Sequence, residues 1–411
     1  MPRPPIAAYC RSSRYTSFVF LTLVVTIFGL SASGCGSGKQ NAGGSPEGGE
    51  ILLGHYASLT GGEATFGRST DNGIKMAIEE INAAGGVNGR TVKLITYDDK
   101  GEKPEAGTAV TRLVTKDGVV AVLGEVASGL SLVAAPICQE YGVPMVSPSS
   151  TNPEVTEKGD MIFRVCFIDP FQAFACAKFA REHEGLKASK AAVLFDQSSP
   201  YAVGLKDEFT KSFTQQGGEV VTAEAYQKGD PDFSAQLTRV RASEPDVVFV
   251  PGYYTDVGNI AIQARRLGIK VPLLGADGWD SEKLGEIAGD SINGCFYSNH
   301  YAPEGSDPLV QEFLKKYKAK YGGMPDCLAG LGYDSAKVLC AAIGRANSTK
   351  GADIAAELAK TKDYEGVAGK FSIDEHRNAA KPAVILEMKN GKPEYVTTIE
   401  PPGGAHEGAA K

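Results

Sequence analysis

The sequence predicts an α/β protein with two doubly wound lobes, each a parallel sheet covered by helices on both faces. Short apolar strands alternate with amphipathic helices from residue 51 to residue 274, which is the pattern of parallel βαβ units. The chain has 411 residues, 42% of them hydrophobic, and 49 glycines, which suits two domains with many tight turns. The alternation breaks at 163–170, where we expect one lobe to give way to the other.

In both sets the strands are apolar runs and the helices carry apolar residues at helical spacing. Ile74, Ile78 and Ile81 show this spacing in the first expected helix, which Gly85-Gly86 should end. The first set is expected to have strands 51–57, 91–97, 119–124 and 143–146, and helices 71–83, 103–116 and 130–141. The second set is expected to have strands 191–195, 219–226, 247–250 and 272–274, and helices 201–216, 233–242 and 257–267.

Four hydroxyl residues follow the strand at 143–146, namely Ser147, Ser149, Ser150 and Thr151. The segment 152–154 then predicts a helix start, where the first N–H groups have no partner within the helix. Such an arrangement binds a small carboxylate, but the same residue types also cap helices that bind nothing. This segment alone leaves both interpretations open.

Ligands of open α/β sheets bind outside the carboxyl ends of the strands, so the residues at the other strand ends are candidates. They are Phe66, Ala127 and Ser128 in the first set, and Tyr201, Tyr253, Asp277 and Trp279 in the second. One set offers hydroxyls and the other offers aromatic rings with one carboxylate. Together they complement a small zwitterion with an apolar side chain.

The N-terminal residues predict an export signal followed by a lipid attachment site. Arg3, Arg11 and Arg14 precede the uncharged run 18–30, which has the length of a signal-peptide core. The segment that ends at Cys35 resembles the lipobox of bacterial lipoproteins, although alanine stands at position 32 where leucine is usual. We expect a lipoprotein signal peptide at 1–34 and a Gly/Ser tether at 35–49; an ordinary cleaved signal is the alternative.

The net charge and the cysteine spacing argue against several classes of partner and site. The formal net charge is −7, and residues 1–34 hold three arginines and no acidic residue, so the remainder is more acidic still. An acidic surface argues against nucleic acid and against a charged membrane. No cysteine pair is spaced as CxxC, so neither a metal nor a redox site is expected. Six cysteines in an exported protein permit disulfides whose pairing stays open: Cys138, Cys166, Cys176, Cys295, Cys327 and Cys340.

A series of segments resembles the type I periplasmic binding proteins, in particular the leucine/isoleucine/valine-binding group that serves ABC importers. The segments cover nearly all of the chain after residue 50 in order: GHYASLTGG, AIEEINAAGGVNGR, LITYDD, VVAVLGEVASG, GVPMVSPSSTNPEVT, FRVCFIDPFQ, VLFDQSSPYAVGL, DVVFVPGYYTDVGNIAIQARRLGI and LLGADGWDS. The resemblance implies two Rossmann-like lobes joined by three hinge crossovers. Lobe 1 would be 50–167 plus 302–374, lobe 2 would be 168–301 plus 375–400, and 401–411 would be a flexible tail.

The same resemblance implies roles for residues of the first lobe. Ser128 corresponds to the serine that binds the ligand carboxylate, and Thr151 to a threonine that contacts both charged groups of the ligand. Ser149 corresponds to a residue whose backbone carbonyl meets the ammonium. Phe66 takes the place of a tyrosine in the first loop.

In the second lobe, Asp277 stands where the family has an acidic residue for the ammonium, but it is shorter than the glutamate of the branched-chain binders. Tyr201 and Tyr253 match aromatic contacts. Trp279 adds bulk beside Asp277, and whether it reaches the ligand is left open. The shorter acid and Phe66 both separate this pocket from the branched-chain pocket.

The resemblance thus implies a monomeric, exported solute-binding protein without cofactor or metal. It would deliver an amino acid to the permease and ATPase of an importer, and touch the membrane only through a lipid anchor at Cys35, in the periplasm or at the cell surface. The alternative is the same fold with an aromatic acid, amide or urea as ligand, for uptake or sensing. An enzyme is not expected, because the five histidines form no nucleophile or metal motif.

Overall fold

The computed structural model describes residues 49–302 and 307–402. The expected signal peptide, the lipid site at Cys35 and nearly all of the expected tether lie outside the described residues, as does most of the expected tail.

The first lobe is built on a parallel sheet of five strands. These are β1 (Ile51–Ala57), β2 (Val92–Asp98), β3 (Ala121–Leu123), β4 (Met145–Ser147) and β5 (Ile162–Arg164). Their order is β2-β1-β3-β4-β5, and every neighbouring pair is parallel. Alternate residues face opposite sides, so Leu123 packs in one core cluster and Val122 in another.

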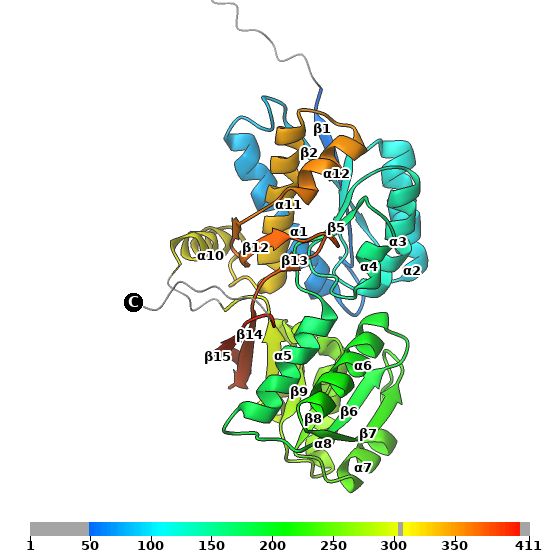
Figure 1. Ribbon diagram of the computed structural model, residues 1–411, viewed down its shortest axis with the longest axis vertical. Coiled ribbons are helices and arrows are strands. Elements are labelled where there is room, and N and C mark those ends of the chain that lie inside the picture. Colours follow the sequence, from blue (N-terminus) through cyan, green and yellow to red (C-terminus); the bar gives the residue numbers. More distant parts are fainter. Residues whose placement is uncertain (1–48, 303–306, 403–411) are drawn as a thin grey trace, which may run out of the picture. The chain divides into compact units, whose positions relative to one another are not determined.

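Helices cover both faces of this sheet. They are α1 (Ala64–Ala83), α2 (Lys103–Arg112) with a π-helical turn at Leu113–Asp117, α3 (Ser128–Glu140), α4 (Glu154–Glu157), α10 (Pro308–Tyr321), α11 (Cys327–Ala346) and α12 (Gly351–Ala359). Figure 1 shows α1 and α11 together on one side of the strands, and α2 and α3 on the other. Gly85 and Gly86 end α1 as expected, because both take positive φ angles and the Gly86 N–H donates to the Ile81 carbonyl.

The second lobe has a seven-stranded sheet. Its strands are β6 (Lys190–Asp196), β7 (Glu219–Tyr226), β8 (Val247–Phe249), β9 (Leu273–Gly275), β10 (Phe296–Asn299), β14 (Ala383–Lys389) and β15 (Lys392–Ile399). The order is β15-β14-β10-β9-β8-β6-β7, with β14 and β15 antiparallel to their neighbours and the others parallel.

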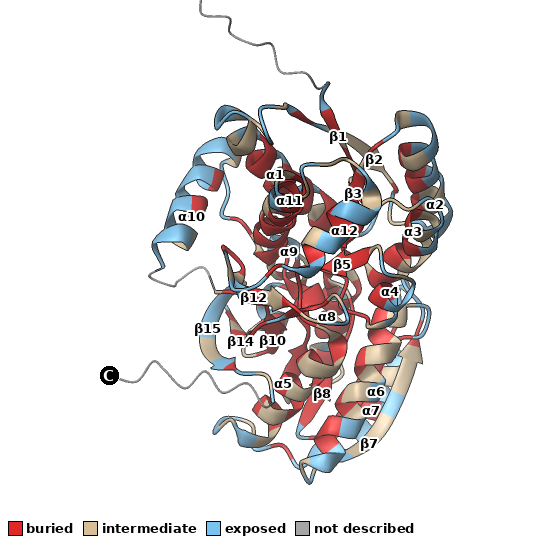
Figure 2. Cartoon of the chain, turned by 45° about the horizontal axis from the view of Figure 1, so that its top comes forward, coloured by how far each residue is buried: buried red, intermediate tan, exposed pale blue. Residues whose placement is uncertain are grey.

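Two groups of helices sandwich this second sheet. The helical segments are α5 (Asp169–Glu182), α6 (Pro200–Gln215), α7 (Ser234–Ala242), α8 (Tyr254–Arg266) and α9 (Glu282–Ala288), with 3-10 turns at Asp277–Trp279 and Gly289–Ile292. Helices α5 and α6 share one core cluster, while α7, α8 and α9 contribute to another. The buried residues line the sheets and the inner faces of these helices (Figure 2).

The chain crosses between the lobes three times. The first crossover lies between β5 and α5, the second follows β10, and the third precedes β14. A small antiparallel sheet of β11 (Tyr364–Gly366), β12 (Gly369–Ile373) and β13 (Ala379–Ala380) precedes the third crossover. Because β13 pairs with β12, residues 379 and 380 belong to the same small sheet as residues 364–373.

Helix α11 and the six cysteines are both buried in the folded chain. Helix α11 has the length and apolar composition of a membrane span, but 83% of its apolar window is buried inside the structure, as in the core helix of a globular domain. The six cysteines of the described residues, for which the sequence left pairing open, are all buried and free.

Candidate functional site

The loops at the strand ends of both lobes enclose a cavity of about 10 Å³. That volume admits about one water molecule, so the lobes are closed on each other. The lining comes from both lobes: Phe66, Val126, Ser149 and Leu328 from the first, and Tyr201, Tyr253, Asp277 and Gly278 from the second. Five of the residues expected from the sequence therefore meet at one place.

Asp277 is the only acidic residue among those that line this cavity. It begins the 3-10 turn after β9 and is 5% exposed. Its Oδ1 accepts hydrogen bonds from Gln172 Nε2 at 2.8 Å and from the Tyr201 hydroxyl at 2.7 Å, and its Oδ2 lies 3.1 Å from His300 Nε2. The Tyr201 hydroxyl also accepts from the Gly278 N–H at 3.0 Å, which fixes the turn. Asp277 is thus a buried and oriented carboxylate.

The hydroxyl segment of the first lobe divides into two functional halves. The Ser147 and Ser150 hydroxyls each donate to the Glu125 carbonyl at 2.8 Å, so they hold the backbone of the neighbouring strand end. Ser149 Oγ and Thr151 Oγ1 are buried and have no hydrogen-bond partner among residues 49–302 and 307–402. Ser149 also lines the cavity. Thr151 is not among the lining residues, so of these two hydroxyls only that of Ser149 belongs to the cavity wall.

The helix expected after this segment is much shorter than a helix-dipole site requires. Helix α4 is a single turn of four residues, and the Asn152 side-chain oxygen accepts a hydrogen bond from the Glu154 N–H at 2.9 Å. The hydroxyl segment is instead held by Arg164 at the end of β5, a fully buried side chain that donates to the carbonyls of Ser150 at 2.5 Å and Asn152 at 2.8 Å. Nothing in the sequence marks this arginine as buried, so it could not be predicted as part of the site.

Ala127 and Ser128 do not line the cavity. Ala127 precedes α3 and Ser128 is its first residue. Ser128 Oγ accepts from the Asn152 N–H at 3.2 Å, so it joins the two loops of the first lobe, and neither residue is among those that line the closed cavity.

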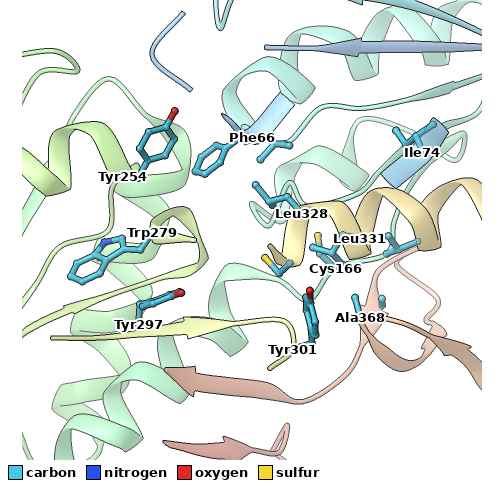
Figure 3. Packing of buried hydrophobic residues seen from close by; sticks show 14 of the residues in the cluster. Phe66, Ile74, Cys166, Tyr254, Trp279, Tyr297, Tyr301, Leu328, Leu331 and Ala368 are labelled. Atoms are coloured by element: carbon cyan, nitrogen blue, oxygen red, sulfur yellow. The ribbon is translucent and has the colours of Figure 1, made fainter. Parts of the chain in front are cut away.

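The walls of the cavity are aromatic. Tyr201 and Tyr253 stack with ring centroids 5.2 Å apart, and Phe66 meets Tyr253 edge-on at 5.6 Å. Phe66 also contacts Tyr254 at 5.0 Å, and the two rings face each other across the lobes in Figure 3. Tyr254 is buried in the core.

Trp279 lies outside the cavity lining. Its indole N–H donates to the Val250 carbonyl at 3.0 Å, and the ring is 1% exposed. It packs beside Tyr297 in the second lobe (Figure 3). The structure therefore places Trp279 in the core. The sequence left open whether Trp279 reaches the ligand, and in the closed structure it does not line the cavity.

Three polar residues that the sequence analysis passed over surround the site. Gln172 and His300 contact Asp277, as described above. Asp169 is the first residue of α5 and is fully buried beside Thr151. The Thr151 hydroxyl is not placed to form a hydrogen bond with the Asp169 carboxyl, but its proximity lowers the pKa of Asp169. Burial outweighs that effect and raises the pKa of Asp169 to about 8.

The closed lobes also touch at the rim of the site. Lys228 Nζ of the second lobe lies 2.9 Å from Glu63 Oε2 of the first. The Thr255 hydroxyl donates to the Gly62 carbonyl at 2.9 Å, and the Thr65 and Ser281 hydroxyls are 2.9 Å apart. These polar contacts can exist only when the lobes are closed.

The sequence of the chain matches a known family over most of its length. A profile of the periplasmic binding proteins matches residues 50–393. A Brucella abortus (strain 2308) protein described as Leu/Ile/Val-binding protein homolog 2 is 31% identical over 346 residues, which are 84% of this chain and 91% of the relative.

Solved structures share the fold. The leucine binding protein LivK of Thermotoga maritima is 41% identical with a TM-score of 0.82, and the match covers 85% of this chain and 99% of that one. The branched-chain amino acid binding protein LivJ of Streptococcus pneumoniae, solved with isoleucine, is 34% identical with a TM-score of 0.81, over 86% of this chain and 100% of that one. The type I fold predicted from the sequence is confirmed, and the chain belongs to the periplasmic binding protein family, in the group of the Leu/Ile/Val-binding proteins.

Proposed function

We propose that this protein is the extracytoplasmic solute-binding component of an ABC importer, and that it captures an apolar amino acid between its two lobes. One observation carries the proposal: Asp277 from one lobe and the free Ser149 hydroxyl from the other line the same apolar-walled cavity. A carboxylate and hydroxyls on opposite lobes complement the ammonium and carboxylate of a zwitterion. The isoleucine in the related LivJ structure supports the same ligand class.

In this mechanism the protein binds and releases, and it catalyses no reaction. The closed cavity is too small for an amino acid side chain, so the lobes must separate at the three crossovers to admit the ligand. The ligand then stabilises the closed form by contacting both lobes at once. The closed form would dock on the permease, and we further propose that acylation at Cys35 holds the protein at the membrane while it does so.

A thermal-shift panel tests the ligand class. Protein freed of bound ligand by unfolding and refolding is heated with leucine, isoleucine, valine, 4-methylpentanoate and benzoate. A ligand at a hundred times its Kd stabilises the folded protein by about 2.7 kcal/mol, which raises Tm measurably. We expect the amino acids to raise Tm and 4-methylpentanoate, which lacks the amine, to leave it unchanged. A response to benzoate alone would replace the amino acid by an aromatic acid.

A further inference from the structure

His300 connects the proposed ligand carboxylate to the hinge. It follows β10 on the second crossover and is 3% exposed. Its Nε2 lies 3.1 Å from Asp277 Oδ2, and its ring stacks on Phe167 of the first crossover, with centroids 3.8 Å apart and planes 21° from parallel. One imidazole thus contacts two of the three crossovers and the acidic side chain of the cavity.

The hydrogen-bond count at Asp277 shows what this contact can do. A carboxylate offers about four acceptor positions. Gln172 and Tyr201 take two on Oδ1, and His300 takes one on Oδ2. One position on Oδ2 is left for an N–H donor of a ligand in the cavity that Asp277 lines.

The protonation of the ring follows from its surroundings. The groups that face His300 are Asp277 and Asp280 of the second lobe and Lys381 at the third crossover. Burial, the largest effect, lowers the pKa of His300 to about 4 against the opposing hydrogen bond to Asp277. A neutral ring that donates to a carboxylate carries its proton on Nε2, so Nδ1 holds the lone pair. Nδ1 is buried and has no partner in the described part of the chain.

We propose that His300 is a positioning residue for ligand binding: its Nε2–H orients Asp277 so that one acceptor position of Oδ2 meets the ligand ammonium. This inference rests on the proposed function. Because the ring also stacks on Phe167, it ties the position of that carboxylate to the backbone segments around which the lobes close. The short side chain of Asp277 makes such support necessary, since it cannot reach toward the ligand as a glutamate does.

Two substitutions separate the N–H donor from simple packing. His300→Gln retains an N–H donor on a side chain of similar reach, whereas His300→Leu removes it. The matched control is His183→Leu, because His183 also stacks on a phenylalanine, Phe179 at 4.5 Å, but does not contact Asp277. Leucine affinity is measured by isothermal titration calorimetry, with Tm recorded for each variant.

We expect His300→Leu to weaken leucine binding roughly 10- to 100-fold, as for the loss of a hydrogen bond to a charged group. His300→Gln should recover most of that loss, and His183→Leu should bind as the wild type does. Equal affinity in all variants, or equal loss in both His300 variants, would overturn the role of the N–H. If wild type binds no amino acid, the proposed function fails instead.

A spectroscopic measurement tests the same role without a substitution in the measured protein. In ¹⁵N-histidine NMR, with the His300 signal assigned from the missing peaks of His300→Gln, we expect a neutral Nε2–H imidazole at pH 6 that titrates near pH 4 and shifts when leucine is added. An Nδ1–H tautomer, or a signal unchanged by leucine in protein that binds leucine, would contradict the proposal.

Discussion

The ion pair between Glu63 and Lys228 should contribute to ligand affinity although neither residue lines the cavity. The pair joins the two lobes at 2.9 Å, with Glu63 buried and Lys228 about half exposed. Burial is the largest single effect and lowers the pKa of Lys228, but the charge and the hydrogen bond of Glu63, together with more distant carboxylates, outweigh it, and the net pKa is raised. Removing either charge therefore penalises the closed form and leaves the open form unaffected.

The size of the effect follows from the geometry. Two charges at this separation attract by about 6 kcal/mol at an effective dielectric constant of about 20. Exposure of Lys228 and loss of its solvation reduce the net value to about 1 kcal/mol, the upper end for exposed pairs. If the ligand-free protein is mainly open, the loss appears as an affinity about fivefold weaker.

A double-mutant cycle measures this contribution. Glu63→Gln, Lys228→Gln and the double variant are titrated with leucine at low and high salt. Each single variant should weaken binding about fivefold, the double variant should be no worse, and the difference from wild type should shrink with salt. Lys211→Gln is the control, because it breaks an exposed pair with Glu208 within the second lobe. Additive losses, or unchanged affinity in the single variants, would show that this ion pair does not stabilise the closed form.

Three further predictions concern the core and the buried titratable groups. Trp279→Phe should lower the free energy of unfolding by about 1–3 kcal/mol in urea, because the Val250 carbonyl loses its donor, and should leave leucine affinity within about twofold; a large affinity loss would return Trp279 to the ligand. As pH falls from 6.5 to 4, His300 takes up a proton in the unfolded chain before it does so in the folded protein. Wild type should therefore lose stability relative to His300→Gln by up to about 1.4 kcal/mol per pH unit. Parallel stability curves of the two proteins would contradict the lowered pKa. As pH rises from about 4 to 8, folded Asp169 keeps a proton that the unfolded chain releases, so wild type should lose stability relative to Asp169→Asn, with the same limiting slope. The opposite trend would show that Asp169 is ionised in the folded protein.

Hydrophobic periodicity was sufficient to predict most elements of both sheets. The strands expected at 51–57 and 219–226 agree with β1 and β7 to the residue. Helix α1 begins at Ala64, earlier than expected, and its first turns contact the region of α11: the Ser69 hydroxyl donates to Asp326, which precedes α11, and Thr70 lies against Gly332. The helix expected after Thr151 is a single turn of four residues.

The positions of strand ends predicted which loops meet at the cavity, and they did so for Ser149 and Asp277 from opposite lobes. Sequence could not predict Leu328 or His300, because both come from segments whose crossovers bring them back to the site from far along the chain. Tyr253 lines the cavity and Trp279 does not. The sequence could not predict this difference, because both are aromatic residues that follow strands of the second lobe.

Calorimetric titration of leucine into wild type and Asp277→Asn shows whether Asp277 binds the ammonium of an amino acid. The substitution keeps the shape of the side chain and removes its charge. Asp196→Asn serves as the control, since Asp196 is also a buried strand-end aspartate of the second lobe but does not line the cavity. We expect leucine to bind to wild type and to Asp196→Asn but not to Asp277→Asn, with all three proteins folded. Unchanged leucine affinity in Asp277→Asn would contradict this role of Asp277.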